Sequence, residues 1–361
     1  MIEIQQKRYF STSNKNLFII SNEMQLLNAK EAQYYYKSQN TIFVFLEFPY
    51  KQDTLRLYQY KENLDCELLI TVKFDGIYLF QDIQLIKYLQ NYIYDNVYVG
   101  YFSERIRYYI ANINYQRLIL VDDGTYVVAL HNELHKGISK HTPSMLKTLH
   151  RRKRNNSVYL IMDSVVERIK QMIFAINGLR YDLKYFNIIF FTIYNLKLYK
   201  NEIIIKNNFN LLKKLYNNIT YNKNIIYFLG QPLNKSMSFT SQEYIGLLKK
   251  IIVYYKKRNI KIYYIPHRSE SLEYKTHLNL LISNYFVIKY IDKPFELYLL
   301  EETEMPFGVA SFFSSALFTS KMIDNSLDIT SFLVSKKQNL REDILSIYKL
   351  LEEDNVQTIL L

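Results

Sequence analysis

The sequence predicts an α/β protein in which two Rossmann-like domains face each other across a cleft. The chain has 361 residues, 49% of them hydrophobic, which is enough to form two ordinary cores. Short apolar runs alternate with helix signals in the first third of the chain, and the alternation resumes after residue 224. Strands that alternate with helices form parallel βαβ units. We therefore expect an N-terminal domain over residues 1–155, a helical connecting region over 156–224 and a C-terminal domain over 225–361.

In the N-terminal part, two helices have recognisable starts. Asn22 is a suitable N-cap for a helix that continues to Tyr36, and Ser103 is one for a helix that continues to about Ala111. The strands expected there are apolar runs rich in β-branched and aromatic residues: Leu17–Ile20, Thr41–Phe45, Glu67–Lys73, Asn96–Gly100 and Arg117–Val121.

In the rest of the chain, Val158–Ile176 reads as a helix and Ile188–Leu198 as a strand, and the Asn- and Lys-rich stretch 201–224 reads as the connection. Ser241 is expected to cap a helix that ends near Lys257. Pro294 suits the start of a short helix, Phe295–Glu301. The strands expected in the C-terminal part are Ile225–Leu229, Lys261–Ile265, Phe286–Ile291 and Val309–Phe313.

The composition excludes several classes of protein and leaves the charge open to interpretation. A single cysteine, Cys66, excludes a disulfide within the chain and a thiolate metal cluster, and we expect it in the core. We find no signal peptide and no apolar run of the ~20 residues that a membrane span needs, so a cytoplasmic protein is expected. The net charge of +12 fits a Lys-rich solvated surface, an anionic substrate, an anionic membrane or a nucleic acid.

Acidic residues follow one of the expected strands. Asp122 and Asp123 come directly after Leu118–Val121 and are followed by Gly124. Ligands collect at the carboxyl ends of strands in open α/β sheets, and one of two adjacent carboxylates can have a raised pKa that suits a general base. The alternative is an ordinary Asp-Gly turn.

Basic residues follow a second strand. His267 and Arg268 come after Pro266, just beyond the strand Lys261–Ile265. Histidine is the natural acid near neutral pH, and an arginine can hold a phosphate. The alternative is a histidine in a surface loop.

Small hydroxyl residues follow a third strand. Ser311, Ser314 and Ser315 lie at the end of an apolar run and before a helix signal. Hydroxyls together with the free N–H groups of a helix start form a site for phosphate. The alternative is simple N-capping by serine.

The order of these three features resembles that of the bacterial sialyltransferases of glycosyltransferase family 52, which act on lipooligosaccharide and capsule. The resemblance covers roughly Arg117 to Lys321 and the strand–helix opening at Leu17–Tyr36. It implies a fold of the glycosyltransferase-B type with an acceptor-side N-terminal domain and a C-terminal domain that binds CMP-sialic acid. The implied reaction is an inverting transfer that needs no metal and no cofactor.

The resemblance also implies roles for individual residues. His267 matches the histidine that protonates or stabilises the departing CMP phosphate, and Ser314 and Ser315 match the serines that hold it. Glu296 matches the acidic residue that binds the cytidine ribose. The loop Gly230, Gln231 and Pro232 matches the family's Gly-x-Pro loop at the donor site, and Arg268 is grouped with these donor-binding residues.

The chain departs from the family pattern in two places. The histidine of the usual His-Pro pair is retained as His267, but Arg268 stands where the proline would follow. A related protein carries an aspartate after Gly-x-Pro as the proposed base, and this chain has Leu233 and Asn234 there. Asp122 or Asp123 is then the remaining candidate for the base.

The implied partners are the CMP-sugar donor and a bacterial surface glycan that contains galactose. The basic run that ends in Arg151, Arg152, Lys153 and Arg154 suits a solvated helix face or contact with an anionic inner membrane. A homodimer stays open. The alternatives to the transferase are a donor-binding glycan-assembly protein without catalysis and a nucleic-acid-binding protein, although no nucleic-acid motif accompanies the charge and we expect no nucleic-acid partner.

Overall fold

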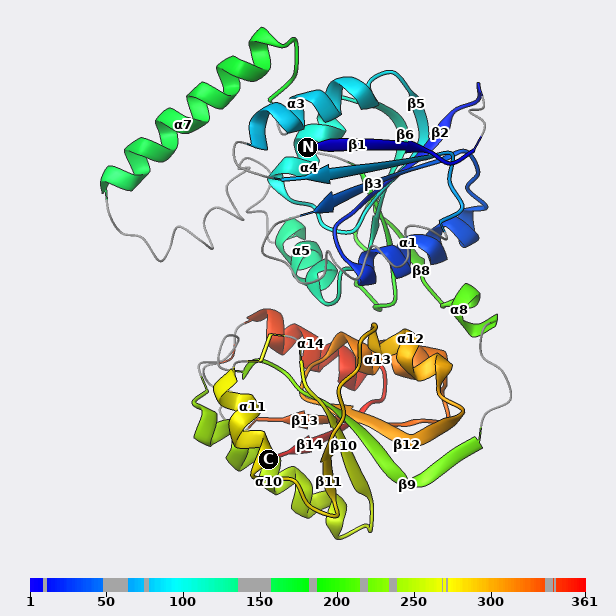
Figure 1. Cartoon of the computed structure of the whole chain (residues 1–361), viewed down its shortest axis with the longest axis vertical. Helices are drawn as coiled ribbons and strands as arrows, with labels where there is room; N and C mark the ends of the chain where they lie inside the picture. The colour runs from blue at the N-terminus through cyan, green and yellow to red at the C-terminus, as the bar shows by residue number, and fades with distance from the viewer. Residues whose placement is uncertain are drawn as a thin grey trace. The chain divides into compact units, whose positions relative to one another are not determined.

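The computed structural model describes residues 1–8, 12–47, 64–74, 78–135, 157–181, 187–214, 220–233, 239–267, 269–270, 272–334, 340 and 342–361. The chain divides into two compact units, Met1–Thr192 with Leu196–Asn207 and Ile193–Asn195 with Asn208–Leu361. In each unit helices pack on a twisted, mainly parallel sheet (Figure 1). The predicted fold class, α/β with two Rossmann-like domains, is confirmed.

The sheet of the first unit has the strand order β1-β4-β3-β2-β5-β6-β7-β8. Only the pairing of β1 with β4 is antiparallel among the described strands, and the central six strands follow the Rossmann order. The strands are β1 (Ile2–Gln6), β2 (Lys15–Ile20), β3 (Thr41–Glu47), β4 (Leu68–Lys73), β5 (Ile93–Val99), β6 (Asn114–Val121), β7 (Ile188–Thr192) and β8 (Ile203–Lys206).

Two helices of the first unit begin where the sequence predicted. Asn22 caps the first of them, because its Oδ1 accepts a hydrogen bond from the Gln25 N–H at 2.9 Å. Ser103 caps another in the same way through the N–H of Ile106. The described helices of this unit are α1 (Glu23–Tyr36), α3 (Tyr78–Leu89), α4 (Glu104–Ala111), α5 (Tyr126–His135) and α7 (Ser157–Ile176).

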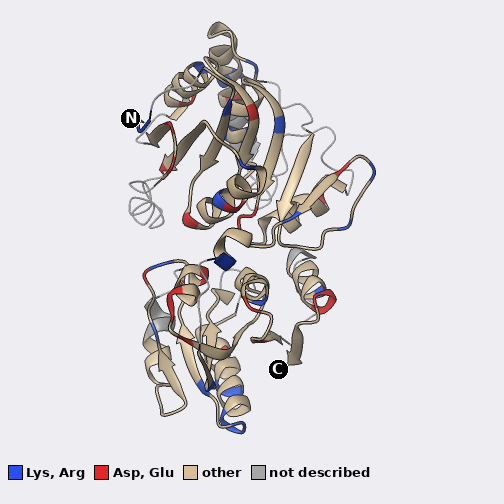
Figure 2. Cartoon of the chain, turned by 90° about the vertical axis from the view of Figure 1, so that its right-hand side faces the viewer, with Lys and Arg blue, Asp and Glu red and all other residues tan. Residues whose placement is uncertain are grey.

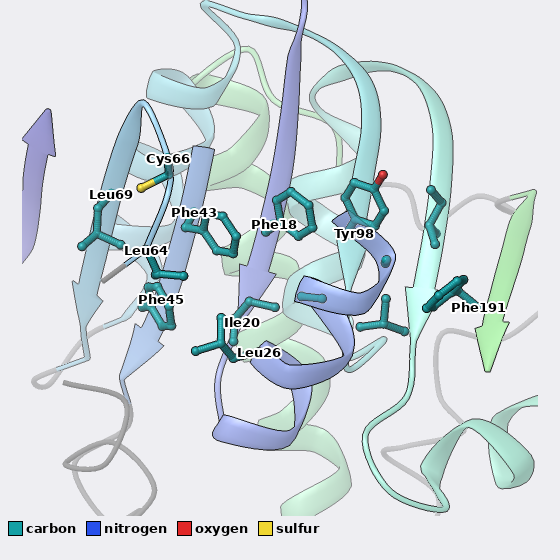
Figure 3. Packing of buried hydrophobic residues seen from close by; sticks show 14 residues of the cluster. Phe18, Ile20, Leu26, Phe43, Phe45, Leu64, Cys66, Leu69, Tyr98 and Phe191 are labelled. Atoms are coloured by element: carbon teal, nitrogen blue, oxygen red, sulfur yellow. The ribbon is translucent and has the colours of Figure 1, made fainter. Parts of the chain in front are cut away.

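Aromatic side chains from neighbouring strands form the centre of the first core (Figure 3). The ring of Phe18 stacks on Phe43 at 4.6 Å and on Tyr98 at 4.2 Å between centroids. Such pairs contribute about 0.5–1.5 kcal/mol each beyond the burial of their area. Cys66 lies in this cluster, and burial raises the pKa of its thiol to about 11. The expectation that it is a core residue is therefore confirmed.

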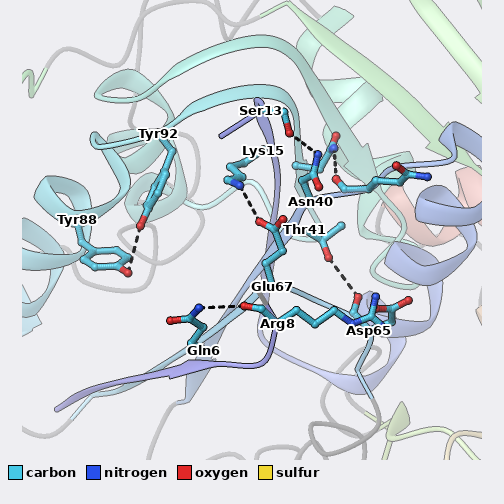
Figure 4. Close-up of polar contacts among 12 residues, drawn as sticks. Gln6, Arg8, Ser13, Lys15, Asn40, Thr41, Asp65, Glu67, Tyr88 and Tyr92 are labelled. Atoms are coloured by element: carbon cyan, nitrogen blue, oxygen red, sulfur yellow. Dashed lines mark hydrogen bonds and ion pairs between the residues drawn. The ribbon is translucent and has the colours of Figure 1, made fainter. Parts of the chain in front are cut away.

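A buried ion pair links the first residue of β2 to the residue before β4 (Figure 4). Nζ of Lys15 lies 2.7 Å from Oε2 of Glu67, and both side chains are less than a tenth exposed. Removing one partner would leave a buried charge, which typically costs about 3–5 kcal/mol. The ion pair thus holds the start of β2 and the start of β4 together.

The second unit repeats the Rossmann order with parallel neighbours, β11-β10-β9-β12-β13-β14. Gly308 allows two of these strands to approach, because a Cβ at this position would lie 2.0 Å from the carbonyl oxygen of Asp328. The strands are β9 (Thr220–Leu229), β10 (Lys261–Ile265), β11 (Phe286–Ile288), β12 (Glu304–Ser311), β13 (Asp328–Leu333) and β14 (Gln357–Leu360).

The helices of the second unit include one corrected cap. Thr240, rather than Ser241, caps α10: it forms a capping box with Glu243, and Ser241 is the first helical residue. Pro294 precedes α12 as predicted. The described helices are α8 (Asn210–Lys214), α10 (Ser241–Lys256), α11 (Leu272–Asn279), α12 (Phe295–Glu301), α13 (Ser315–Ile323) and α14 (Glu342–Glu353).

The middle of the chain differs from the expected connecting region 156–224. Strands β7 and β8 extend the first sheet, and β9 begins at Thr220 and belongs to the second. The run Ile203–Lys206 is four residues long and lies among Asn and Lys, so only its pairing with β7 identifies it as a strand. Similarly, β12 ends at Ser311, whereas the sequence placed this strand at Val309–Phe313.

Lys and Arg residues lie among Asp and Glu residues in the described helices and strands of both units (Figure 2). Arg151–Arg154 lie outside the described residues. Among the helices that the structure describes, none combines the length and apolar character required to cross a membrane.

Candidate functional site

Each sheet reverses its strand order once, and ligands of open α/β sheets bind at the carboxyl ends of the strands at that point. In the first unit this point lies between β2 and β5, and in the second between β9 and β12. The residues singled out from the sequence follow β6 in the first unit, and β9, β10 and β12 in the second, except Glu296, which lies on α12 after β11.

Gln231 spans the switch point of the second unit. Its Oε1 accepts a hydrogen bond from the Phe313 N–H at 2.8 Å and lies 3.4 Å from the Ser311 hydroxyl. The same hydroxyl donates to the Leu229 carbonyl at 2.7 Å. The loop after β9 is thereby fixed to the loop after β12, and Gln231 is itself buried.

A chain of buried hydrogen bonds links this loop to the one that carries His267. The Gln231 N–H donates to the Tyr244 hydroxyl at 3.3 Å, and that hydroxyl is 2.6 Å from the Tyr264 hydroxyl. Tyr264 donates to Oε1 of Glu270 at 2.7 Å, and the His267 N–H donates to the same oxygen at 3.2 Å. Burial raises the pKa of Tyr264 well above its ordinary value, so its hydroxyl stays protonated and donates.

Gly230 makes this arrangement possible. A Cβ at Gly230 would lie 2.1 Å from Oε1 of Glu270 and 2.3 Å from the Tyr264 hydroxyl. Any side chain at this position would push the carboxylate away from the His267 loop. The glycine of the Gly-Gln-Pro loop is therefore required by its neighbours within the protein.

The ring of His267 has a fixed orientation. Its Nδ1 accepts a hydrogen bond from the Ser269 N–H at 3.0 Å, which assigns the proton of the neutral ring to Nε2. A histidine in this form offers Nε2–H as a hydrogen-bond donor to an anion. The side chain is half-buried. Arg268 lies outside the described residues.

Ser314 and Ser315 form the start of α13. Ser314 is the N-cap, and its Oγ accepts a hydrogen bond from the Ala316 N–H at 3.2 Å. Both serines are half-buried, and the first turn of α13 contains no acidic residue. N-capping, the simpler interpretation, is thus observed for Ser314, and the helix start keeps the partial positive charge that favours an anion.

Glu296 lies in the first turn of α12 and is buried. Its Oε1 accepts a hydrogen bond from the Thr319 hydroxyl of α13 at 2.8 Å. Burial raises the pKa of this carboxyl, against the smaller opposing effect of its hydrogen bonds. Glu296 therefore lies beside the second turn of the helix that Ser314 caps.

Leu233 is fully buried, so it is part of the core. Its N–H donates to the Gln231 carbonyl at 2.9 Å, in a tight turn after Pro232. Asn234 lies outside the described residues. The described part of this loop accordingly supplies no carboxylate at the place where the family pattern suggested one.

In the first unit, Asp123 is held by two side-chain amides. Nδ2 of Asn22 donates to its Oδ1, and Nε2 of Gln25 donates to its Oδ2, each at 2.9 Å. Gly124 follows with φ 59°, a left-handed conformation that favours glycine. The half-buried Asp123 is thus fixed in orientation at the carboxyl end of β6.

Asp122 has a different environment. It is 1% exposed, and its carbonyl oxygen accepts a hydrogen bond from Nδ2 of the buried Asn28 at 3.1 Å. A general base must reach its substrate within hydrogen-bond distance. Of the two adjacent aspartates, the geometry favours Asp123 as the group that can reach a substrate.

Three residues at these strand ends escaped the sequence analysis. Gln25 holds Asp123 and also accepts from the Ser21 N–H at 2.8 Å, while Glu270 and Tyr264 hold the His267 loop. Glu270 lies three residues after His267, a spacing at which a side chain can reach back to the backbone. Gln25 carried no signal because Asp123 lies 98 positions away, and Tyr264 carried none because it is one of several aromatic residues of an apolar strand.

No family model matches the chain, and no curated protein matches its sequence. Solved structures with a similar course of the chain include UDP-GlcNAc 2-epimerase from Methanocaldococcus jannaschii, at 10% identity, a TM-score of 0.45, and coverage of 94% of this chain and 92% of that one. Arabidopsis thaliana UGT89C1 complexed with UDP has 10% identity and a TM-score of 0.48, and the match covers 96% of this chain and 86% of that one. E. coli heptosyltransferase WaaC with ADP-2-deoxy-2-fluoro heptose has 10% identity and a TM-score of 0.42, and the match covers 94% of this chain and 99% of that one.

Proposed function

We propose that the chain is a glycosyltransferase of the glycosyltransferase-B type that transfers a sialic-acid-type sugar from a CMP-activated donor to a bacterial surface glycan. The observation that carries the proposal is the hydrogen-bonded group at the carboxyl ends of β9, β10 and β12. It fixes Gln231, His267 and the start of α13 within one unit. The choice of CMP-sialic acid as donor rests on the family resemblance of these residues.

On the donor side, the departing phosphate would bind at the start of α13. The N–H groups there and the hydroxyls of Ser314 and Ser315 suit an anion. Nε2–H of His267 would donate to a phosphate oxygen and stabilise the charge that develops as the glycosidic bond breaks. Because Nδ1 accepts a hydrogen bond, we favour this stabilising role over proton transfer from a neutral ring.

The nucleoside would be held by Glu296 and the Gly230–Pro232 loop. Glu296 lies beside α13 through its hydrogen bond with Thr319, and a carboxyl group can accept a hydrogen bond from a ribose hydroxyl. On the acceptor side, we assign the base to Asp123. Its two amide donors stabilise the carboxylate form, which would take the proton from the acceptor hydroxyl.

Peripheral contact with an anionic membrane remains part of the proposal. Val165, Ile169, Met172 and Ile176 are exposed on α7 at spacings that place them along one helix face, and the sequence 151–154 before the helix is basic. We expect the protein to float with vesicles that contain anionic lipid, and Ile169→Asp to weaken this. Equal flotation of the variant would contradict the contact.

The test of the function compares nucleotides and donors. Calorimetry of the full chain with CMP, UDP and ADP should give the tightest binding for CMP, and CMP-sialic acid with galactose-terminated glycans should release CMP. We expect His267→Ala to lower turnover roughly 10²–10³-fold, the usual cost of losing such a donor. His277→Ala, on α11, is the matched control.

Two results would contradict the proposal. Preferential binding of UDP or ADP would remove the CMP assignment while keeping a nucleotide-sugar enzyme. Full turnover in a folded His267→Ala variant would remove the assigned role of the histidine. If CMP binds but neither sugar transfer nor slow donor hydrolysis occurs, the second candidate is favoured, a donor-binding assembly protein. The buried Leu233, which stands where a base was expected, supports this candidate.

A further inference from the structure

Two histidines and a glutamate converge in the first unit, away from the residues discussed so far. His131 and His135 lie one turn apart on α5, and Glu202 directly precedes β8. Nε2 of His131 is 3.0 Å from Oε2 of Glu202, and Nε2 of His135 is 2.9 Å from Oε1. Helical residues four apart share a face, so both rings reach the same carboxylate.

The three side chains have the donor atoms and spacing of a metal site. Their ligand atoms all lie within 4.8 Å of one another. Zinc–ligand bonds of ~2.0–2.1 Å in a tetrahedron place neighbouring ligand atoms roughly 3.3 Å apart. The observed distances of 2.9 and 3.0 Å therefore need only a small expansion for an ion to enter.

The type and burial of the ligands select the ion. Two imidazoles and one carboxylate are a set that zinc binds readily, whereas calcium and magnesium prefer oxygen ligands alone. The side chains of His131 and Glu202 are 2% and 8% exposed, and that of His135 is 24% exposed. The ion would therefore be largely enclosed, with access from the side of His135.

Neighbouring groups fix the orientation of all three side chains. The Tyr199 ring stacks on His135 with 3.6 Å between centroids, and the Tyr199 N–H donates to Oε2 of Glu202 at 3.2 Å. Phe190 of β7 packs edge-on against His131 at 5.3 Å. Outer contacts of this kind orient metal ligands and typically change affinity about 10–100-fold when they are removed.

We propose that His131, His135 and Glu202 bind one Zn²⁺ ion that joins the end of α5 to the start of β8. Glu202 lies at the amino end of β8, and α5 runs back from the carboxyl end of β6. Asp123 lies at the opposite, carboxyl end. Three protein ligands leave the fourth tetrahedral position to water, and the site is independent of the proposed sugar transfer.

The alternative arrangement without metal is a pair of neutral histidines, each of which donates Nε2–H to the carboxylate. It satisfies the same contacts, so the experiment must separate the two. Purified full chain would be stripped with a chelator and titrated with Zn²⁺ by calorimetry. In parallel, Co²⁺ would replace zinc, and its visible spectrum would report the geometry of the ligands.

We expect about one zinc per chain, a tetrahedral Co²⁺ spectrum, and a higher Tm with zinc than without. His135→Ala, at the more exposed ligand, and Glu202→Gln should each weaken zinc binding more than the ~10–100-fold typical of an outer contact. His277→Ala should bind zinc as the wild type does. Absence of saturable zinc binding in the folded wild type, or unchanged affinity in both ligand variants, would overturn the proposal.

Discussion

The central six strands of the first unit have the same order as the six strands of the second, but the two units differ in what lies at the point where that order reverses. In the first unit, α1 begins with Asn22 and has the acidic Glu23 in its first turn, and Asn22 and Gln25 hold the carboxylate of Asp123. In the second, α13 begins with two serines and has no acidic residue in its first turn. An anion is repelled by the first arrangement and attracted by the second.

Glycines at the two positions have the same physical function. A Cβ at Gly100, after β5, would lie 2.2 Å from the Gln25 side chain, and one at Gly230 would lie 2.1 Å from Glu270. Each glycine lets a polar side chain pass close to the backbone and orient a candidate site residue. At these strand ends the two units therefore differ in charge, and the proposed roles, a base in the first unit and phosphate binding in the second, follow that difference.

The largest effect is expected for Asp123→Asn. The amide keeps the size of the side chain but cannot take a proton, so turnover should fall about 10²–10⁴-fold while CMP affinity stays the same. Initial rates and calorimetry measure the two quantities. Asp95→Asn is the matched control, because Asp95 also accepts hydrogen bonds from two amides, those of Asn14 and Gln116. A large loss of CMP affinity in Asp123→Asn would contradict the division of roles.

An intermediate effect is expected for Gly230→Ala. The new methyl group would meet Glu270 and Tyr264, so the free energy of unfolding should fall by about 1–3 kcal/mol and CMP should bind more weakly. Gly246→Ala is the control with the opposite sign. It lies on α10 with open space around its Cβ position and should stabilise by about 0.5–1 kcal/mol. Denaturant unfolding measures the free energy of unfolding of both variants. Equal changes in the two would contradict the prediction, because they would show that the neighbours of Gly230 can move aside for a methyl group.

The smallest effect is expected for Glu296→Gln, and it depends on pH. Burial raises the pKa of Glu296 in the folded state, so its contribution to stability is present below the unfolded pKa of about 4.3 and is lost as pH rises through the folded pKa. The glutamine can still accept from Thr319 and carries no charge. Its stability relative to the wild type should therefore rise with pH across this window. Thermal melts at several pH values measure this. A difference in Tm between the two proteins that stays constant with pH would contradict the raised pKa of Glu296.

Local patterns predicted most of the elements. Asn22 and Ser103 were identified as caps because a short polar side chain before a periodic segment satisfies a free N–H of the first turn. Lys261–Ile265 was predicted with its observed ends, since a dense apolar run has few alternatives to a buried strand. The cap at α10 was misplaced by one residue, because Thr240 and Ser241 are both suitable and the reach of Glu243 decides between them.

Other features depend on residues that are far apart along the chain. The segment β8 is identified as a strand by its pairing with β7. Its own apolar run is too short, and its flanking residues too polar, to predict a strand from the sequence. Gln25 and Asp123 are separated by 98 positions, and His131 and Glu202 by 71. Helix and strand periodicity report neighbours within a turn or two and carry no information at these separations.

The sequence by itself determined the fold class, the positions of most strands and the types of residue at their carboxyl ends. It could do so because caps, breakers and apolar periodicity act over a few residues. Only the tertiary structure decided which side chains meet: which aspartate is half-buried, how the Nδ1 of His267 is engaged, and that two histidines face Glu202. Those outcomes depend on crossovers that bring distant strand ends and helix ends together, and these contacts exist only once each sheet has formed.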